Sequence, residues 1–92
     1  MSTNSSERKR GFFEILAGIL GSLTDGDLPR THIVYSANLN FKRLPTYLAT
    51  LEQLGLLAKI ETSNGTKYKL TEKGNLFLKR YRDLVSLLKE EE

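Results

Sequence analysis

The chain of 92 residues contains no cysteine and no long apolar run. Without cysteine, disulfide bonds, zinc sites built from thiolates and thiol catalysis are all excluded. The longest apolar run falls far short of the roughly 20 residues that a membrane-spanning helix needs, and the N-terminus is polar. We therefore predict a cytoplasmic protein with no membrane as partner.

Residue patterns suited to catalysis are also scarce. His32 is the single histidine, and no cysteine or suitably placed acid accompanies it in the sequence. Asp25 and Asp27 pair in a loop, without the basic or apolar surroundings that would give two acids different roles. The glycines form no phosphate-binding pattern after a strand. We expect no enzyme, no catalytic residue, no cofactor, no metal site and no small-molecule substrate.

What the chain does have is an uneven distribution of charge. Its net charge is only +3, with a pI near 9.3, so the whole protein is not a polycation. Residues 29–71 nevertheless carry six cations against two acids. A local basic patch is typical of a surface that meets nucleic-acid phosphates. The length fits one domain, residues 1–92, whose small core would gain from a second copy, so we expect a homodimer.

The first part of the chain predicts a helix that follows a polar tail. The helix is predicted from about residue 6 to residue 23, because apolar residues recur at intervals of three and four between Phe12 and Leu23. A tail over residues 1–7 is expected to be mobile. A loop with Asp25 and Asp27 comes next. Its acids should lie away from any DNA.

A helix-turn-helix is predicted in the middle of the chain. Residues 31–37 suit a short second helix, which ends where Asn38 can adopt a left-handed backbone conformation. Asn40 can then cap the helix after the turn. Two amphipathic helices joined by so compact a turn are the signature of this motif.

The third helix combines an apolar stripe with a basic leading end. The stripe predicts burial of Phe41, Leu44, Leu48, Leu51 and Leu54. The other positions are small, polar or basic, which suits a helix in the DNA major groove: Lys42, Arg43, Thr46, Ala49, Thr50 and Gln53. Pro45 would remove a helical hydrogen bond, so the helix either kinks after one turn or begins at Leu44. An ordinary amphipathic surface helix is the alternative.

A β-hairpin, here called the wing, should follow a glycine-capped helix end at Gly55. Its predicted strands are residues 58–62 and 66–70, joined by a turn over residues 63–65 whose Asn-Gly pair favours positive φ. The alternation predicts Leu57, Ile60, Tyr68 and Leu70 inward, with Lys59, Lys67 and Lys69 outward on one basic face. Lysines also protect strand edges from aggregation, which is the alternative reason for this pattern.

The last helix is predicted over residues 72–92, with Thr71 as its N-cap. Its apolar stripe is wider than so small a core needs. Part of it should seal the core, and the part from Tyr81 onward should meet the same helix of a second chain. The predicted dimer interface comprises Phe77, Tyr81, Leu84, Val85 and Leu88.

Several of these segments resemble the archaeal ten-kilodalton winged-helix DNA-binding proteins of crenarchaeal chromatin. The resemblance rests on residues 30–41, Tyr47-Leu48, Leu51, residues 54–57 and residues 68–74. It implies a mainly α-helical winged helix-turn-helix with a small β-hairpin and a C-terminal dimerisation helix. It further implies an elongated homodimer, joined by an antiparallel coiled coil, that binds duplex DNA with little sequence preference. Carried onto this chain, it places Lys42, Arg43 and Thr46 on the recognition helix, Lys67 and Lys69 on the wing, and Tyr81, Leu84 and Leu88 in the dimer seam.

We therefore predict sequence-tolerant binding of double-stranded DNA by a nucleoid-associated architectural protein. The predicted contacts are Arg30, Lys42, Arg43, Thr46, Thr50, Lys67 and Lys69. A small sequence-specific transcriptional regulator is one alternative. A protein-interaction module is another, and exposure of Phe41, Tyr47 or Tyr35 as an apolar patch would favour it. RNA binding is less favoured, because no ladder of exposed aromatic residues is evident.

Overall fold

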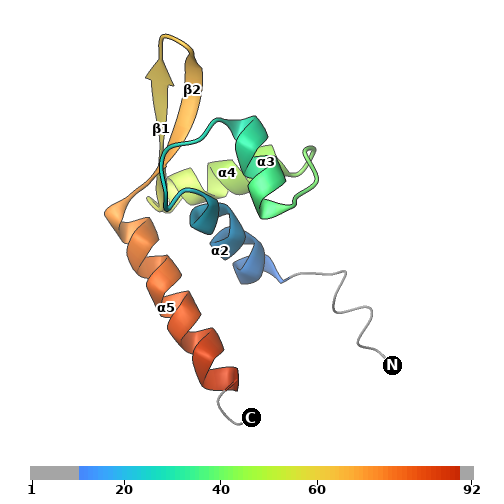
Figure 1. The fold of residues 1–92 in the computed structure, drawn as a ribbon, viewed down its shortest axis with the longest axis vertical. Coiled ribbons are helices and arrows are strands. Elements are labelled where there is room, and N and C mark those ends of the chain that lie inside the picture. Colours follow the sequence, from blue (N-terminus) through green and yellow to red (C-terminus); the bar gives the residue numbers. More distant parts are fainter. Residues whose placement is uncertain (1–10, 90–92) are drawn as a thin grey trace.

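The computed structural model describes residues 11–89, and within them four helices and a two-stranded sheet form the fold (Figure 1). The elements are α2, Phe12–Ser22; α3, Arg30–Ala37; α4, Leu44–Gln53; β1, Leu57–Thr62; β2, Gly65–Leu70; and α5, Glu72–Lys89. The predicted fold class, mainly α-helical with a β-hairpin wing and a long last helix, is confirmed. The predicted mobile tail, residues 1–7, and the predicted helix end, residues 90–92, lie outside the described residues.

The wing and α5 extend in opposite directions from a body built of α2, α3 and α4 (Figure 1). The principal dimensions of 48 × 27 × 22 Å reflect this elongation. The molecule therefore has two ends, one formed by the wing with the helix-turn-helix beside it and one formed by the last turns of α5.

The hydrophobic core lies where the three short helices meet. Its fully buried side chains come from all three of them: Leu16, Ile19 and Leu20 of α2, Ile33 of α3, and Leu44 and Leu51 of α4. The spacing of three and four that predicted the helices also supplies this buried face. The last helix contributes Leu78, through its contact with α2.

The predicted glycine cap at the end of α4 is confirmed. Gly55 has φ +77°, and its N–H donates to the carbonyl of Glu52 at 3.0 Å. The N–H of Leu56 donates to the carbonyl of Leu51 at 2.9 Å. Together these bonds satisfy carbonyl groups that a helix end leaves without partners. They also direct the chain from the end of α4 toward β1.

The start of α5 is bonded to the end of α4. Thr71 is the N-cap as predicted, since its Oγ1 accepts from the N–H of Gly74 at 3.0 Å. The Thr71 hydroxyl donates to the carbonyl of Gly55 at 2.7 Å, and the Lys73 ammonium donates to the carbonyl of Leu54 at 2.7 Å. Lys73 is therefore occupied in joining two helices.

Gly74 has a packing role at the same junction. A Cβ atom at this position would collide with the carbonyl oxygen of Leu56 and would lie 2.9 Å from a methyl group of Leu70. Only glycine allows the first turn of α5 to approach the backbone so closely. The direction of α5 relative to α4 depends on this contact.

The wing is bonded to the segment before α3, a feature that sequence reasoning missed. Leu28 and Tyr68 exchange both backbone hydrogen bonds, at 3.1 and 2.8 Å. An isolated two-stranded hairpin is marginal in water, and this bridge adds a third partner at the root of the wing. The loop after α2, described only as acidic in the sequence, thus lies beside β2.

Candidate nucleic-acid interface

The helix-turn-helix is set by two asparagines. Asn38 has φ 55° and ψ 55°, the left-handed conformation predicted for it, and it ends α3. The side-chain oxygen of Asn40 accepts from the N–H of Lys42 at 2.9 Å. This bond caps the turn over residues 41–43, whereas the N-cap of α4 itself is Arg43, without a side-chain bond.

Pro45 does not disturb α4. The helix begins at Leu44, so Pro45 lies in its first turn, where an N–H would have no helical partner. Of the two outcomes left open by the sequence, the later helix start is confirmed. As a result, Lys42 and Arg43 lie immediately before the helix rather than on its first turn.

The outer face of α4 carries short and polar side chains. Thr46, Ala49 and Gln53 are exposed on it, and Arg43 is exposed just before its first turn. Thr50 is half-buried, and its hydroxyl donates to the carbonyl of Thr46 at 3.1 Å. Such a bond occupies the donor of Thr50 within the helix, which leaves few groups on this face for contacts to base edges.

The prediction that Phe41 belongs to the buried stripe is wrong. Phe41 is 52% exposed, because the late start of α4 leaves it in the turn rather than on the helix face that packs on the core. The Arg30 guanidinium carbon lies 5.8 Å from the centre of the Phe41 ring, within the range of a cation–π contact. Leu54, also predicted to be buried, is exposed where α4 ends.

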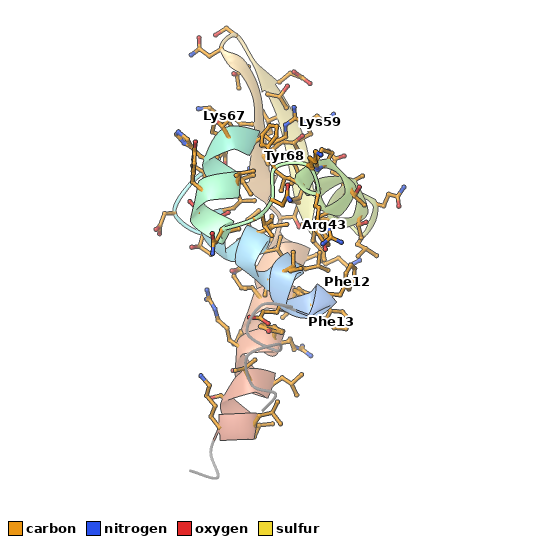
Figure 2. All side chains as sticks on the ribbon, turned by 90° about the vertical axis from the view of Figure 1, so that its right-hand side faces the viewer. Phe12, Phe13, Arg43, Lys59, Lys67 and Tyr68 are labelled. Carbon is orange, nitrogen blue, oxygen red and sulfur yellow. The ribbon has the colours of Figure 1, made fainter. Side chains whose placement is uncertain are left out.

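The prediction that three lysines share one basic face of the wing is also wrong. The register pairs Leu57 with Leu70 and Lys59 with Tyr68, so Lys59 lies on the same face as these largely apolar residues. Lys67 and Lys69 lie on the opposite face, where Lys67 pairs with Ile60. Figure 2 shows Lys59 and Lys67 on the two sides of the wing, with Arg43 below Lys59.

The turn of the wing explains this register. Thr62 pairs with Gly65, so Ser63 and Asn64 are the two central residues of the turn. Gly65 has φ +120°, but Asn64 does not have the positive φ expected from the Asn-Gly pair. The Thr62 hydroxyl accepts from the N–H of Asn64 at 3.1 Å and donates to the carbonyl of Gly65 at 2.7 Å. The predicted turn covers three residues, 63–65, whereas the observed turn has two central residues. Because side chains alternate between the two faces of a strand, this difference of one residue changes which residues share a face.

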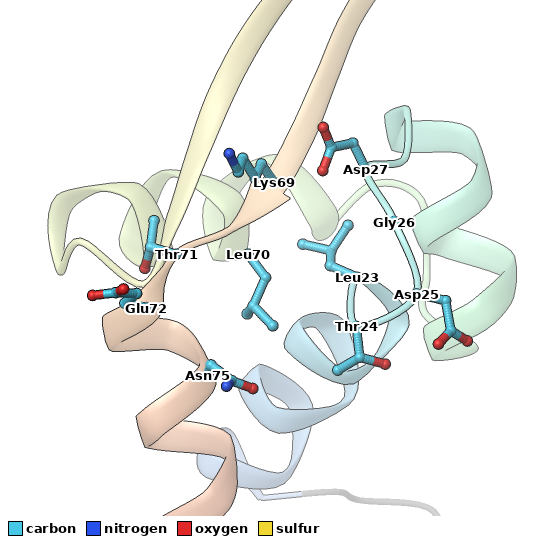
Figure 3. A pocket seen from close by; sticks show the side chains of 10 residues that line it. All are labelled: Leu23, Thr24, Asp25, Gly26, Asp27, Lys69, Leu70, Thr71, Glu72 and Asn75. Carbon is cyan, nitrogen blue, oxygen red and sulfur yellow. The ribbon is translucent and has the colours of Figure 1, made fainter.

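Lys69 lies in acidic surroundings. It lines a pocket of about 450 Å³ with Asp25 and Asp27 of the loop after α2 and with Glu72 at the start of α5 (Figure 3). The loop comes close because of the bridge between Leu28 and Tyr68. Lys67, nearer the tip of the wing, does not line this pocket.

A second groove, of about 370 Å³, lies between α3 and the wing. It is lined by Pro29, Arg30, Thr31, Phe41, Lys59, Thr66 and Tyr68. Sequence reasoning missed Lys59 and Phe41 as residues of one site. The signal that could have found them is the register, because a turn centred on Ser63 and Asn64 places Lys59 opposite Tyr68.

The last turns of α5 expose leucines. Leu84 is 55% exposed and Leu88 is 74% exposed, whereas Tyr81 and Val85 are half-buried. Phe77 is half-buried against the protein's own core, and its ring centre lies 6.3 Å from that of Phe13. The predicted interface residues thus divide into a part that packs on the core and a part left uncovered.

An apolar groove runs beside this helix. It has a volume of about 270 Å³ and is lined by Phe13, Phe77, Arg80, Tyr81 and Leu84. Aromatic contacts continue from it toward α4, since Phe13 meets Phe12 at 5.6 Å and Phe12 meets Tyr47 at 6.3 Å. The start of α2 therefore connects α5 with α4.

Two observations on residues 11–89 concern metal ligands and membrane-spanning helices. In this range no three histidine, cysteine, aspartate or glutamate side chains lie close enough together to hold a metal ion. His32 lies exposed on α3. No helix of the described range is long and apolar enough to cross a membrane.

Comparison with known proteins gives a consistent picture. A family model described as winged helix-turn-helix matches residues 9–89. An uncharacterized protein of Methanocaldococcus jannaschii is 34% identical over 79 residues, covering 86% of this chain and 74% of that protein. Sso10a-2, a DNA-binding protein from Sulfolobus solfataricus, has a TM-score of 0.79 at 26% identity, covering 88% of this chain and 84% of its own. The family resemblance drawn from the sequence is confirmed.

A further solved structure shares the fold. It is the homodimeric winged helix-turn-helix DNA-binding domain of a Mycobacterium bovis protein, described as a possible ArsR-family transcriptional regulator. Its TM-score is 0.60 at 19% identity, covering 84% of this chain and 68% of that one. At this identity the similarity shows the fold alone.

Proposed function

This chain belongs to the winged helix-turn-helix family, and on that basis we propose that it binds double-stranded DNA as a homodimer. The proposed binding is largely tolerant of base sequence and uses the turn before α4, the outer face of α4 and the wing. The similarity to Sso10a-2, which is named as a DNA-binding protein, supports this proposal.

The observation that carries the proposal is the surface around the start of α4. Lys42 and Arg43 are exposed beside a helix face of small polar side chains. Arg30 and Lys59 add two exposed cations from α3 and β1. Cations grouped around the start of a helix with small polar side chains match the phosphates that border a major groove.

The same surface favours phosphate contacts over base reading. Its long cationic side chains precede α4, and phosphate contacts position a protein without reading sequence. On the helix itself, the donor of Thr50 is already bonded to the carbonyl of Thr46. A role in nucleoid architecture therefore accounts for the surface better than recognition of one operator.

The homodimer is proposed from the uncovered part of α5. Leu84, Leu87 and Leu88 are exposed on a helix whose earlier turns pack against α2. An apolar stripe of this kind in so small a protein favours pairing with a second copy, which would cover it. Pairing would also bring two DNA-binding surfaces into one particle, which raises the overall affinity.

The experiment that tests this function measures affinity for several unrelated duplexes of equal length across a salt series. Similar affinities with one steep salt dependence would support phosphate-based, sequence-tolerant binding. One duplex bound about 10³-fold more tightly would favour a regulator instead. Absence of binding at low salt would contradict DNA binding altogether.

One observation favours a second candidate, a protein-interaction module. Tyr35 is 81% exposed on α3, and exposure of this residue was among the features expected of such a module. Phe41 is exposed as well, but the Arg30 guanidinium lies over its ring. This candidate predicts that Lys42 and Arg43 are dispensable for function, whereas replacement of Tyr35 is not tolerated.

A further inference from the structure

The groove between α3 and the wing contains cations from two different elements. Arg30 is the first residue of α3, and Lys59 is the third residue of β1. Both line the groove, together with the aromatic ring of Phe41. Nothing in the sequence places Lys59 beside Arg30, because 28 positions lie between them and only the fold brings them together.

The root of the wing determines this arrangement. Tyr68 is buried, pairs with Lys59 across the wing and bonds to Leu28 in the segment before α3. Leu28 is two residues before Arg30 in the chain. The bridge therefore holds Arg30 and Lys59 on two sides of one groove with Tyr68 between them.

Among the described residues, nothing neutralises the charges of these two cations by ion pairing. Within residues 11–89, no carboxylate forms an ion pair with Arg30 or Lys59. Glu61 lies on the same face of the wing, two residue pairs nearer the tip, and its Oε1 accepts from the Thr66 hydroxyl at 2.9 Å. The part of the groove at the root of the wing, away from Glu61, is thus the part suited to an anion.

Phe41 restricts the guanidinium of Arg30. A guanidinium over an aromatic ring has one face occupied while the N–H groups at its edge remain available to an oxyanion. Phe41 lines the groove and directly precedes Lys42, so the groove lies beside the basic turn before α4. An anion held here would lie beside the turn that carries Lys42 and Arg43.

We propose that Arg30 and Lys59 together bind one backbone phosphate of duplex DNA, and that Phe41 is a positioning residue which orients the Arg30 guanidinium. This inference rests on the proposed function, since duplex DNA is its ligand. It adds a contact on the inner face of the wing, distinct from those of the recognition helix. It also assigns a function to an exposed phenylalanine that packing does not explain.

The test is a double-mutant cycle on affinity for one duplex. Phe41→Leu removes the ring and should weaken binding about two- to fivefold, the range of an exposed cation–π contact. In an Arg30→Ala background the same change should have almost no effect, because Phe41 acts through Arg30. Phe41→Tyr keeps a ring and should retain wild-type affinity. The matched control is Tyr35→Leu, an exposed aromatic residue of α3 outside the groove.

Lys59 is tested in the same way. Lys59→Ala should weaken binding, and the loss should be smaller in the Arg30→Ala background because both residues serve one phosphate. The double variant should lower the slope of log affinity against log salt by about one. Lys79→Ala, which removes an exposed cation of α5, is the control. Unfolding midpoints of all variants establish that the fold is kept.

The outcomes separate this inference from the proposed function. If Arg30→Ala and Lys59→Ala leave affinity unchanged while Arg43→Ala lowers it, the phosphate site is contradicted and DNA binding stands. If Phe41→Leu weakens binding equally with and without Arg30, the positioning role is contradicted. If wild-type protein binds no duplex at low salt, both the site and the function are contradicted.

Discussion

The two ends of this molecule expose opposite kinds of side chain. Around the wing and α4 most cations are exposed and most leucines are buried, with Phe41 and Leu54 as exposed exceptions, whereas the last turns of α5 expose Leu84 and Leu88. A small monomer needs neither the exposed cations at one end nor the exposed leucines at the other for its own stability. The difference supports the proposal that the two ends meet different partners, a polyanion at one and an apolar surface at the other.

The largest expected effect comes from making the apolar end polar. Leu84→Glu should convert the proposed dimer to a monomer, because a carboxylate in an apolar seam loses its hydration. Affinity for a duplex long enough for both copies should fall by roughly 100-fold through lost bivalency. Sedimentation and binding measured on the same samples check this. A variant that still sediments as a dimer would place the seam elsewhere; Ser86→Glu, another exposed position of α5, is the control.

The next effect concerns the junction that joins the two ends. Gly74→Ala should lower the free energy of unfolding by about 2–3 kcal/mol, because its Cβ would collide with the backbone of Leu56. Thermal or denaturant unfolding measures the change. Gly11→Ala, where a Cβ meets nothing within 4 Å, is the matched control. Equal stability of both variants would mean that α5 can tilt without cost.

A smaller effect is expected at the basic end. Arg43→Ala should weaken binding to all duplexes alike and lower the salt slope by about one, if it contacts a single phosphate. Binding titrations over a salt series on unrelated duplexes measure both quantities. Loss of affinity for one duplex only would instead show that Arg43 reads a base.

The smallest effect compares two lysines on one face of the wing. Lys67→Ala should weaken DNA binding more than Lys69→Ala, because Lys69 shares its pocket with Asp25, Asp27 and Glu72. The carboxylates nearby would oppose the approach of phosphates at Lys69. Equal losses of affinity in a side-by-side titration would show that Lys69 reaches the DNA despite these acids.

Local signals predicted much of the fold. Asn38, Gly55 and Thr71 adopt the turn, cap and N-cap conformations expected of them, because each depends only on a few neighbouring residues. The order of helices and strands followed from hydrophobic periodicity for the same reason. Most element boundaries moved by one to three residues, most importantly at Leu44, whereas α2 begins at Phe12 rather than near residue 6.

The environments of particular side chains could not be predicted in this way. Burial of Phe41 was expected from its spacing to Leu44, but the turn before α4 removes it from the helix. The face occupied by Lys59 depends on which residues form the turn of the wing. Neither the exposure of Phe41 nor the face occupied by Lys59 depends on composition. Charge counts and periodicity therefore carry no information about these two environments.

The amino-acid order determined the element types, the basic middle of the chain and the apolar surplus of the last helix, since these are local properties. The fold decided which cations share a surface. It placed Lys59 beside Arg30 and Lys69 beside acids through the strand register and the bridge between Leu28 and Tyr68. Such pairings join residues far apart in the chain, and only simultaneous packing of all the elements can select them.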